Sequence, residues 1–254
     1  MARIVLIHGG WMGAWCWEKL TPLLDQAGHQ VTTIDLPGHG EDPTPAHEAN
    51  MTGYVSKVCA VLADLDGPAH LLGHGMGGLV ITQVAELMPD RVISLIYLAA
   101  LIAPPGEAGP PIGQDSALPA AREFSDDACT MTVNPGAITD VFFADCADND
   151  IAQAKQRMVP LSTDMMPAGR DQPVRHWPQI PRSYISCRDD RLLPLSMQHQ
   201  MITDTGFDHV VEMATSHSPF YSAPEDLARH IAHLTGQYRR PAMLVNCHPD
   251  QPSI

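Results

Sequence analysis

The feature that most constrains this chain is a glycine-rich segment at residues 73–78, GHGMGG, which lies between two apolar segments. Residues 69–72 before it form a short apolar run typical of a buried strand. The residues after it repeat apolar side chains at helical spacing until Pro89, where a helix must end. The chain must therefore turn sharply from a strand into a helix, and glycine permits the close backbone approach that such a turn requires.

Similar strand and helix signals alternate along much of the chain. Their order, strand then helix, predicts a parallel sheet with helices on both faces. Residues 222–225 read as a capping box that starts the last helix. The other expected strands cover residues 3–7, 30–35, 92–99, 183–187 and 209–213, and the other expected helices cover 15–27, 52–65, 195–204 and 223–236.

The alternation breaks in the middle of the chain, where proline and glycine crowd residues 104–112 and shorter mixed segments follow. We interpret residues 103–179 as an inserted helical cap over the carboxyl edge of the sheet. The core is then made of residues 1–102 and 180–237. Residues 238–254 are rich in proline and polar side chains and form a surface tail with no assigned function.

Composition excludes several classes of partner. The formal net charge of −14 argues against nucleic acid, which needs a clustered basic surface. The chain enters its first strand without a secretory h-region, and no apolar run is long enough to span a membrane. We therefore expect a cytoplasmic protein with reduced thiols. A homodimer is also possible from the sequence. The cysteines show no paired spacing: Cys16, Cys59, Cys129, Cys146, Cys187 and Cys247.

Two interpretations of the glycine turn compete. The spacing of Gly73, Gly75 and Gly78 matches G-x-G-x-x-G, which binds dinucleotides when an acidic residue follows about 20 residues later. Residues 98–102 read LAALI and offer no acid there, and the turn follows the third expected strand, not the first. The other interpretation is the G-x-S-x-G nucleophile elbow, with Gly75 in place of the serine. The sequence favours this elbow.

An elbow of this type needs an acid after a later strand and a histidine after the last strand. Asp189 and Asp190 follow the expected strand at 183–187, and either could be the acid. His217 follows the last expected strand. We also expect an oxyanion hole, made by a backbone N–H of the glycine segment after the first strand, residues 8–10, and by the N–H of Met76 beside the elbow residue.

Taken together, these motifs resemble the α/β-hydrolase superfamily, in the branch of plant methylesterases and hydroxynitrile lyases. The resemblance implies an α/β-hydrolase fold in which Asp190 orients His217 and His217 acts as general base, with Gly10 and Met76 as oxyanion donors. It spans the core from residue 3 to about residue 236, while the cap matches only loosely. The matching segments are residues 8–17, 35–40, 73–78, 97–100 and 215–219.

Two positions separate the esterases of that branch from its lyases. The lyases carry threonine directly after the first-motif histidine and lysine directly after the catalytic histidine. This chain has Gly9 and Ser218 there, so it resembles the esterase side. For the substrate pocket we expect Gly9, Trp11 and two cap methionines, Met158 and Met165, although these methionines could equally be plain core.

Gly75 departs from the family pattern because it has no side chain to attack a carbonyl. Loss of a triad serine lowers turnover by about a millionfold, while binding and the oxyanion hole survive. We therefore interpret the chain as an inactivated carboxylic ester hydrolase for a small, largely apolar ester. The alternative is a natural non-hydrolytic protein, either a ligand receptor or an enzyme using His217 as general base. No metal or organic cofactor is expected.

Overall fold

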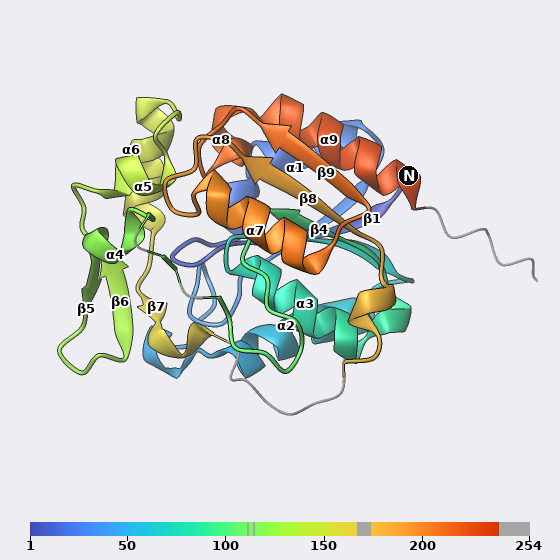
Figure 1. The fold of residues 1–254 in the computed structure, drawn as a ribbon, viewed down its shortest axis with the longest axis horizontal. Helices are drawn as coiled ribbons and strands as arrows, with labels where there is room; N and C mark the ends of the chain where they lie inside the picture. The colour runs from blue at the N-terminus through green and yellow to red at the C-terminus, as the bar shows by residue number, and fades with distance from the viewer. Residues whose placement is uncertain (111, 114, 167–173, 239–254) are drawn as a thin grey trace, which may run out of the picture.

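A six-stranded parallel sheet runs through the computed structural model, which describes residues 1–110, 112–113, 115–166 and 174–238 (Figure 1). The strand order is β2-β1-β3-β4-β8-β9, and every neighbouring pair is parallel. All six strands expected from the sequence are present, which confirms the predicted parallel sheet. Their bounds are β1 Arg3–Ile7, β2 Gln30–Ile34, β3 Ala69–His74, β4 Val92–Leu98, β8 Arg182–Cys187 and β9 His209–Met213.

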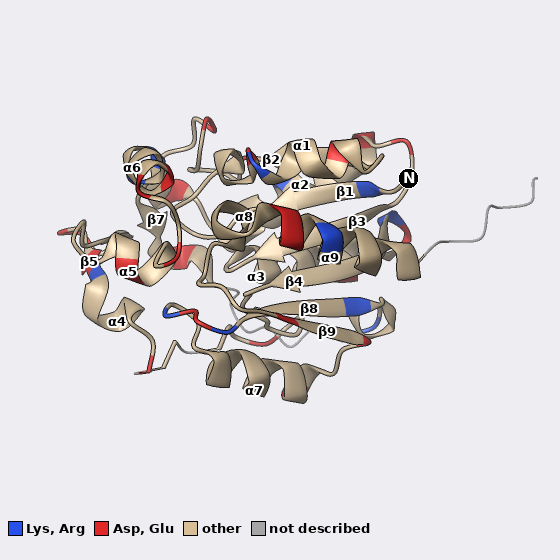
Figure 2. Ribbon diagram, turned by 90° about the horizontal axis from the view of Figure 1, so that it is seen from above, with Lys and Arg blue, Asp and Glu red and all other residues tan. Residues whose placement is uncertain are grey.

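Helices cover both faces of the sheet, as the alternation predicts. On one face, α1 (Leu20–Gln26) packs against α9 (Pro224–Gln237). On the other, α2 (Met51–Asp64) packs against α3 (Gly77–Leu87), while α7 (Leu195–Thr205) lies beside β8 (Figures 1 and 2). Strand β3, at the centre of the sheet, is buried along its whole length. The turn that follows β3 is therefore held from several sides.

Two predicted helix starts differ from the structure. The helix expected over residues 15–27 is a short 3-10 helix, Ala14–Trp17, followed by α1 from Leu20, because Pro22 lacks an N–H and is tolerated only in a first turn. The prediction of a capping box at residues 222–225 is wrong. Ser222 ends the short helix α8 (Pro219–Ser222), and α9 starts without a side-chain cap, with Pro224 in its first turn.

The elements of residues 118–162, between β4 and β8, lie beyond the carboxyl ends of the strands (Figure 1). The expectation of a helical cap is only partly met, because a small antiparallel sheet accompanies the helices. Its strands have two to four residues, too few for a period of two to stand out in the sequence. The elements are α4 Leu118–Ala121, β5 Arg122–Phe124, β6 Thr130–Val133, α5 Ile138–Phe142, α6 Asp148–Arg157 and β7 Leu161–Ser162.

Further 3-10 turns connect the main elements at Ala46–Glu48, Pro89–Arg91, Thr163–Met165 and Trp177–Gln179. None of the helices in the described ranges combines the length and apolarity needed to cross a bilayer. The five cysteines in those ranges are free thiols. Apart from Tyr238, the tail expected at residues 238–254 lies outside the described residues.

Several histidines are buried in this core, and burial lowers their pKa because the charged form loses its hydration. The pKa of His70 falls to about 4, and that of His8 falls to about 3. The pKa of His39 and of His74 is lowered for the same reason. These histidines are neutral in the folded protein at neutral pH.

We expect the protein to lose stability in weak acid. Unfolded histidine binds a proton near pH 6.5, whereas folded His70 does so only near pH 4, so the unfolded chain takes up more protons between these values. The stability of the fold with neutral His70 is therefore fully present above about pH 6.5, and it decreases as the pH falls toward 4. At pH 5, His70 alone should lower the free energy of unfolding by about 2 kcal/mol relative to pH 7, measured by urea denaturation.

A single substitution isolates this effect. His70→Asn keeps a polar group where Nδ1 lies 2.8 Å from the Ser94 hydroxyl, but it does not titrate. Its unfolding free energy should depend less steeply on pH between 7 and 5, whereas the exposed control His47→Asn should retain the original slope. Equal slopes for His70→Asn and the unmodified protein would contradict the assignment.

Candidate active site

The glycine turn joins β3 to α3 at the carboxyl edge of the sheet, and three of its glycines are fixed by close backbone contacts. A Cβ added at Gly73 would lie 2.5 Å from the Gly77 carbonyl oxygen, and one at Gly77 would lie 2.6 Å from the Ile7 carbonyl oxygen. At Gly78 the corresponding contact, with the Leu101 carbonyl oxygen, is 2.4 Å. These positions exclude any side chain, because backbone atoms cannot move aside as a flexible side chain can.

Gly75 differs from its neighbours because it has room for a side chain. Its φ of +52° is a left-handed conformation that glycine adopts without strain. A Cβ at this position would lie 3.5 Å from His217 Nε2 and 3.6 Å from Gly9 Cα, which are ordinary contact distances. The Gly75 carbonyl accepts hydrogen bonds from the N–H groups of Gly78 and Leu101, at 3.2 and 2.9 Å. The turn therefore has the geometry of a nucleophile elbow that lacks only the side chain.

His217 forms a buried pair with Asp190. The distance from His217 Nδ1 to Asp190 Oδ2 is 2.7 Å, and both side chains are almost inaccessible to solvent. The other carboxylate oxygen accepts hydrogen bonds from the backbone N–H groups of Leu192 and Leu193, at 2.8 Å each. Asp189, the other candidate acid, is exposed and pairs with Arg188. The structure therefore brings Asp190 to the imidazole, which leaves Nε2 facing Gly75.

Two contacts hold the His217 loop. His74 donates a hydrogen bond from Nε2 to the His217 carbonyl, at 2.9 Å. Burial, together with the nearby His217, holds the pKa of His74 well below its usual range, so His74 stays neutral beside the dyad. From the cap, Asp145 accepts hydrogen bonds from the Ser216 N–H, at 2.8 Å, and from the Ser216 hydroxyl. Sequence reasoning missed Asp145, since it belongs to no motif and lies 71 residues before Ser216.

The predicted oxyanion donors, Gly10 and Met76, both line a cavity in front of Gly75. Within the described residues, neither of their backbone N–H groups has a hydrogen-bond partner. His8 lies behind this loop, where it donates from Nδ1 to the Gly9 carbonyl and accepts at Nε2 from the Leu36 N–H. His8 is thus a neutral structural residue, and two N–H donors remain free to bind an oxyanion.

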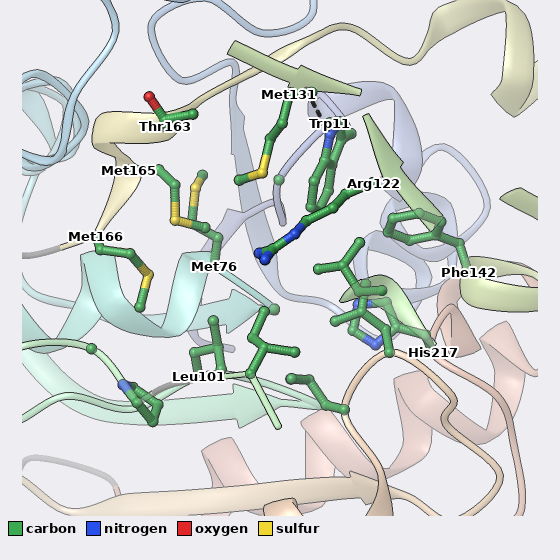
Figure 3. Close-up of a pocket in the computed structure, with 18 of the residues that line it drawn as sticks. Trp11, Met76, Leu101, Arg122, Met131, Phe142, Thr163, Met165, Met166 and His217 are labelled. Carbon is green, nitrogen blue, oxygen red and sulfur yellow. Dashed lines mark hydrogen bonds between the residues drawn. The ribbon is translucent and has the colours of Figure 1, made fainter. Parts of the chain in front are cut away.

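The cavity has a volume of about 410 Å³ and lies between the sheet edge and the cap (Figure 3). Its wall is largely apolar, and no aspartate or glutamate of the described residues lines it. Among the described residues of this wall, Arg122 and His217 carry ionisable side chains. The apolar side chains include Trp11, Met76, Leu101, Ile112, Leu118, Phe124, Met131, Phe142, Met165, Met166, Leu192 and Leu193.

Of the four residues expected to bind substrate, the structure places Trp11 and Met165 in the cavity wall. Gly9 is not in the wall, because it packs on the elbow: a Cβ there would lie 2.8 Å from His74 Nδ1. Met158 is also outside the wall, since it follows the end of α6 and packs, partly buried, against the core. Met131 and Met166 line the cavity instead.

Trp11 also connects the loop that contains Gly10 to the cap. Its indole N–H donates to the Met131 carbonyl at 3.0 Å, and its ring packs edge-on against Phe142. Its φ of +63° is unusual for a residue with a side chain and costs about 1–2 kcal/mol. These contacts with the cap keep Trp11 in this conformation beside Gly10.

Comparisons with known proteins show the fold and the family of the chain. The family model described as "Alpha/beta hydrolase family" matches residues 4–230. A pyrethroid hydrolase of Sphingobium wenxiniae is 32% identical, over 98% of this chain and 94% of that protein. Methylesterase 9 of Arabidopsis thaliana is 24% identical, over 94% of this chain and 100% of that protein. The crystal structure of a pyrethroid hydrolase from Sphingobium faniae superposes with a TM-score of 0.83 at 30% identity, covering 92% of this chain and 97% of that chain.

The room at Gly75 predicts that a serine fits there at modest cost. We expect Gly75→Ser to lower the free energy of unfolding by about 1–2 kcal/mol, the penalty for a left-handed residue with a side chain. Gly28→Ser is the matched control, because Gly28 also has positive φ but nothing within 4 Å of its Cβ position. Chemical denaturation should give similar losses for the two variants.

Gly77→Ser should behave differently and lose much more stability, because its Cβ would meet a backbone oxygen. If Gly75→Ser were as damaging as Gly77→Ser, the inferred space beside His217 would not exist.

Proposed function

Since the chain belongs to the alpha/beta hydrolase family, as a relative of methylesterases and pyrethroid hydrolases, we propose that its cavity binds a small, largely apolar carboxylic ester. The ester carbonyl would sit at Gly75, with its oxygen toward the N–H groups of Gly10 and Met76. In this chain Gly75 supplies no nucleophile, so we propose that binding proceeds without the acyl-enzyme route. The site is thus an esterase site in its inactivated form.

One observation carries this proposal: His217 Nε2 lies 3.5 Å from the place where a Gly75 Cβ would be. In a serine-containing elbow, a histidine there removes the hydroxyl proton as the oxygen attacks the carbonyl. Asp190 stabilises the imidazolium that forms, and the two N–H donors bind the tetrahedral oxyanion. The histidine then returns the proton to the leaving alcohol, and water repeats the sequence to release the acid.

The substrate class follows from the cavity and from the relatives. About 410 Å³ suits a small molecule, and the apolar wall suits its hydrocarbon parts. Two relatives are named for hydrolysis, one of pyrethroids and one of methyl esters. From these two relatives we infer for this chain only that its ligand contains an ester group and is a small molecule.

A second candidate function is proton transfer without a covalent intermediate. It is favoured by the pairing of His217 with Asp190, at 2.7 Å, in a chain whose elbow lacks a nucleophile. Here His217 would act as general base directly on a bound ligand or on a water molecule. If such a ligand bound without turnover, the same cavity would serve as a receptor.

Gly75→Ser should convert the protein into an esterase. We expect hydrolysis of p-nitrophenyl butyrate, with a burst of p-nitrophenol, at a rate on the order of 10⁴ to 10⁶ times that of the unmodified chain. Gly75→Ala is the matched control, because it imposes the same backbone strain without the hydroxyl. Adding His217→Ala to Gly75→Ser should abolish the gain. A folded Gly75→Ser protein without hydrolysis or burst would contradict the ester hydrolase proposal.

The second candidate is tested on the unmodified chain. Turnover of a bound ester by the Gly75 form, stopped by His217→Ala, would favour general-base catalysis. Tight binding with no turnover, in both the Gly75 and the Gly75→Ser forms, would instead favour a receptor.

A further inference from the structure

In the described part of the largely apolar cavity wall, Arg122 is the one side chain that carries a permanent positive charge. It begins the cap strand β5, which pairs antiparallel with β6 so that Arg122 lies opposite Val133 and Phe124 lies opposite Met131. Alternate residues of a strand point to opposite faces. Arg122 and Phe124 both line the cavity, whereas Glu123 between them accepts a hydrogen bond from Asn134. Arg122 is therefore an exposed residue whose side chain lines the cavity, while the neighbouring carboxylate points to the other face of the hairpin.

The guanidinium has no counter-ion in the described part of the chain. It makes no ion pair or hydrogen bond there, and its central carbon lies 5.2 Å from the centre of the Phe124 ring. Figure 3 shows the side chain running from the cap strand into the cavity. Guanidinium carries five N–H donors and stays charged at any pH the protein tolerates. No carboxylate of the described cavity wall is available to neutralise it.

We propose that Arg122 binds a carboxylate of the ligand, so that the preferred substrate is a half-ester: an ester at one end and a free carboxylate at the other. This inference rests on the proposed ester-binding function and adds the anionic end. A planar carboxylate matches the guanidinium fork and accepts two parallel hydrogen bonds from it. A phosphate is less suitable, because the described wall has no lysine and no second arginine to balance a dianion.

The position of Arg122 also assigns an orientation. The oxyanion donors Gly10 and Met76 lie on the sheet side of the cavity, and Arg122 lies on the cap side. The ester group would therefore face Gly75 and the carboxylate would face the cap. The apolar side chains between them, such as Leu101, Phe142 and Leu193, would contact the hydrocarbon spacer. Arg122 then determines specificity and takes no part in the bond-making step.

The first test uses Gly75→Ser with two matched esters at pH 8, monomethyl terephthalate and dimethyl terephthalate. We expect kcat/KM to be at least about 10-fold higher for the half-ester, the lower range for a hydrogen bond to a charged group. Arg122→Gln should lower kcat/KM for the half-ester by about 10- to 100-fold, mainly through KM, and change it less than about threefold for the diester. Arg122→Lys should fall between these values, because it keeps the charge but loses the fork.

Arg229→Gln is the matched control for net charge. It removes one exposed cation on α9, outside the cavity wall, and should leave both esters unaffected. The proposal is overturned if Arg122→Gln lowers kcat/KM equally for both esters, because Arg122 would then only support the cap by stacking on Phe124. It is also overturned if the half-ester is not preferred.

A binding measurement separates this proposal from the esterase proposal. Calorimetry on the unmodified Gly75 form, with monomethyl terephthalate and then dimethyl terephthalate, requires no catalysis. Tighter binding of the half-ester that is lost in Arg122→Gln supports the role of Arg122 even if Gly75→Ser is inert. Equal binding of the two esters, unchanged in Arg122→Gln, would overturn it even if Gly75→Ser is an active esterase.

Discussion

The buried hydrogen bond between Asp190 and His217 is the interaction on which the site depends. It joins the loop after β8 to the loop after β9, and it sets which imidazole nitrogen faces Gly75. A buried carboxylate is tolerable only when it is paired and hydrogen-bonded, and Asp190 meets this condition through two backbone N–H groups as well as the imidazole. The dyad is thus a fixed part of the core and not a flexible surface pair.

Around the dyad, the backbone itself sets the geometry of the elbow. Gly73, Gly77 and Gly78 lie so close to neighbouring carbonyl oxygens that a side chain at any of them would clash. Gly75 is under no such restriction, and the space beside it opens onto His217. The elbow therefore has packing that would aim a side chain at position 75 toward His217 and the cavity. We expect a hydroxyl at position 75 to change the chemistry of the site far more than the fold.

The cap contributes to the site in two ways. Asp145 holds the Ser216 backbone next to His217, so the position of the base depends on a residue of the insertion. The hairpin of β5 and β6 brings Arg122 and several apolar side chains to the opposite wall of the cavity. In the proposed function, the loops of the sheet carry out the ester chemistry and the cap selects among ligands.

The sequence by itself determined the parallel sheet, the glycine turn and the order of elbow, acid and histidine, because each depends on local periodicity or on short motifs. It also named Gly10, Met76 and His217. For the acid, the residues alone left Asp189 and Asp190 open and the family resemblance implied Asp190, which the tertiary structure pairs with His217. The tertiary structure alone places Gly9 and Met158 outside the cavity wall and brings Asp145 and Arg122 to the site. These outcomes could not be predicted because they depend on contacts between segments far apart in the chain, and on the register of short cap strands that leave no periodic signal.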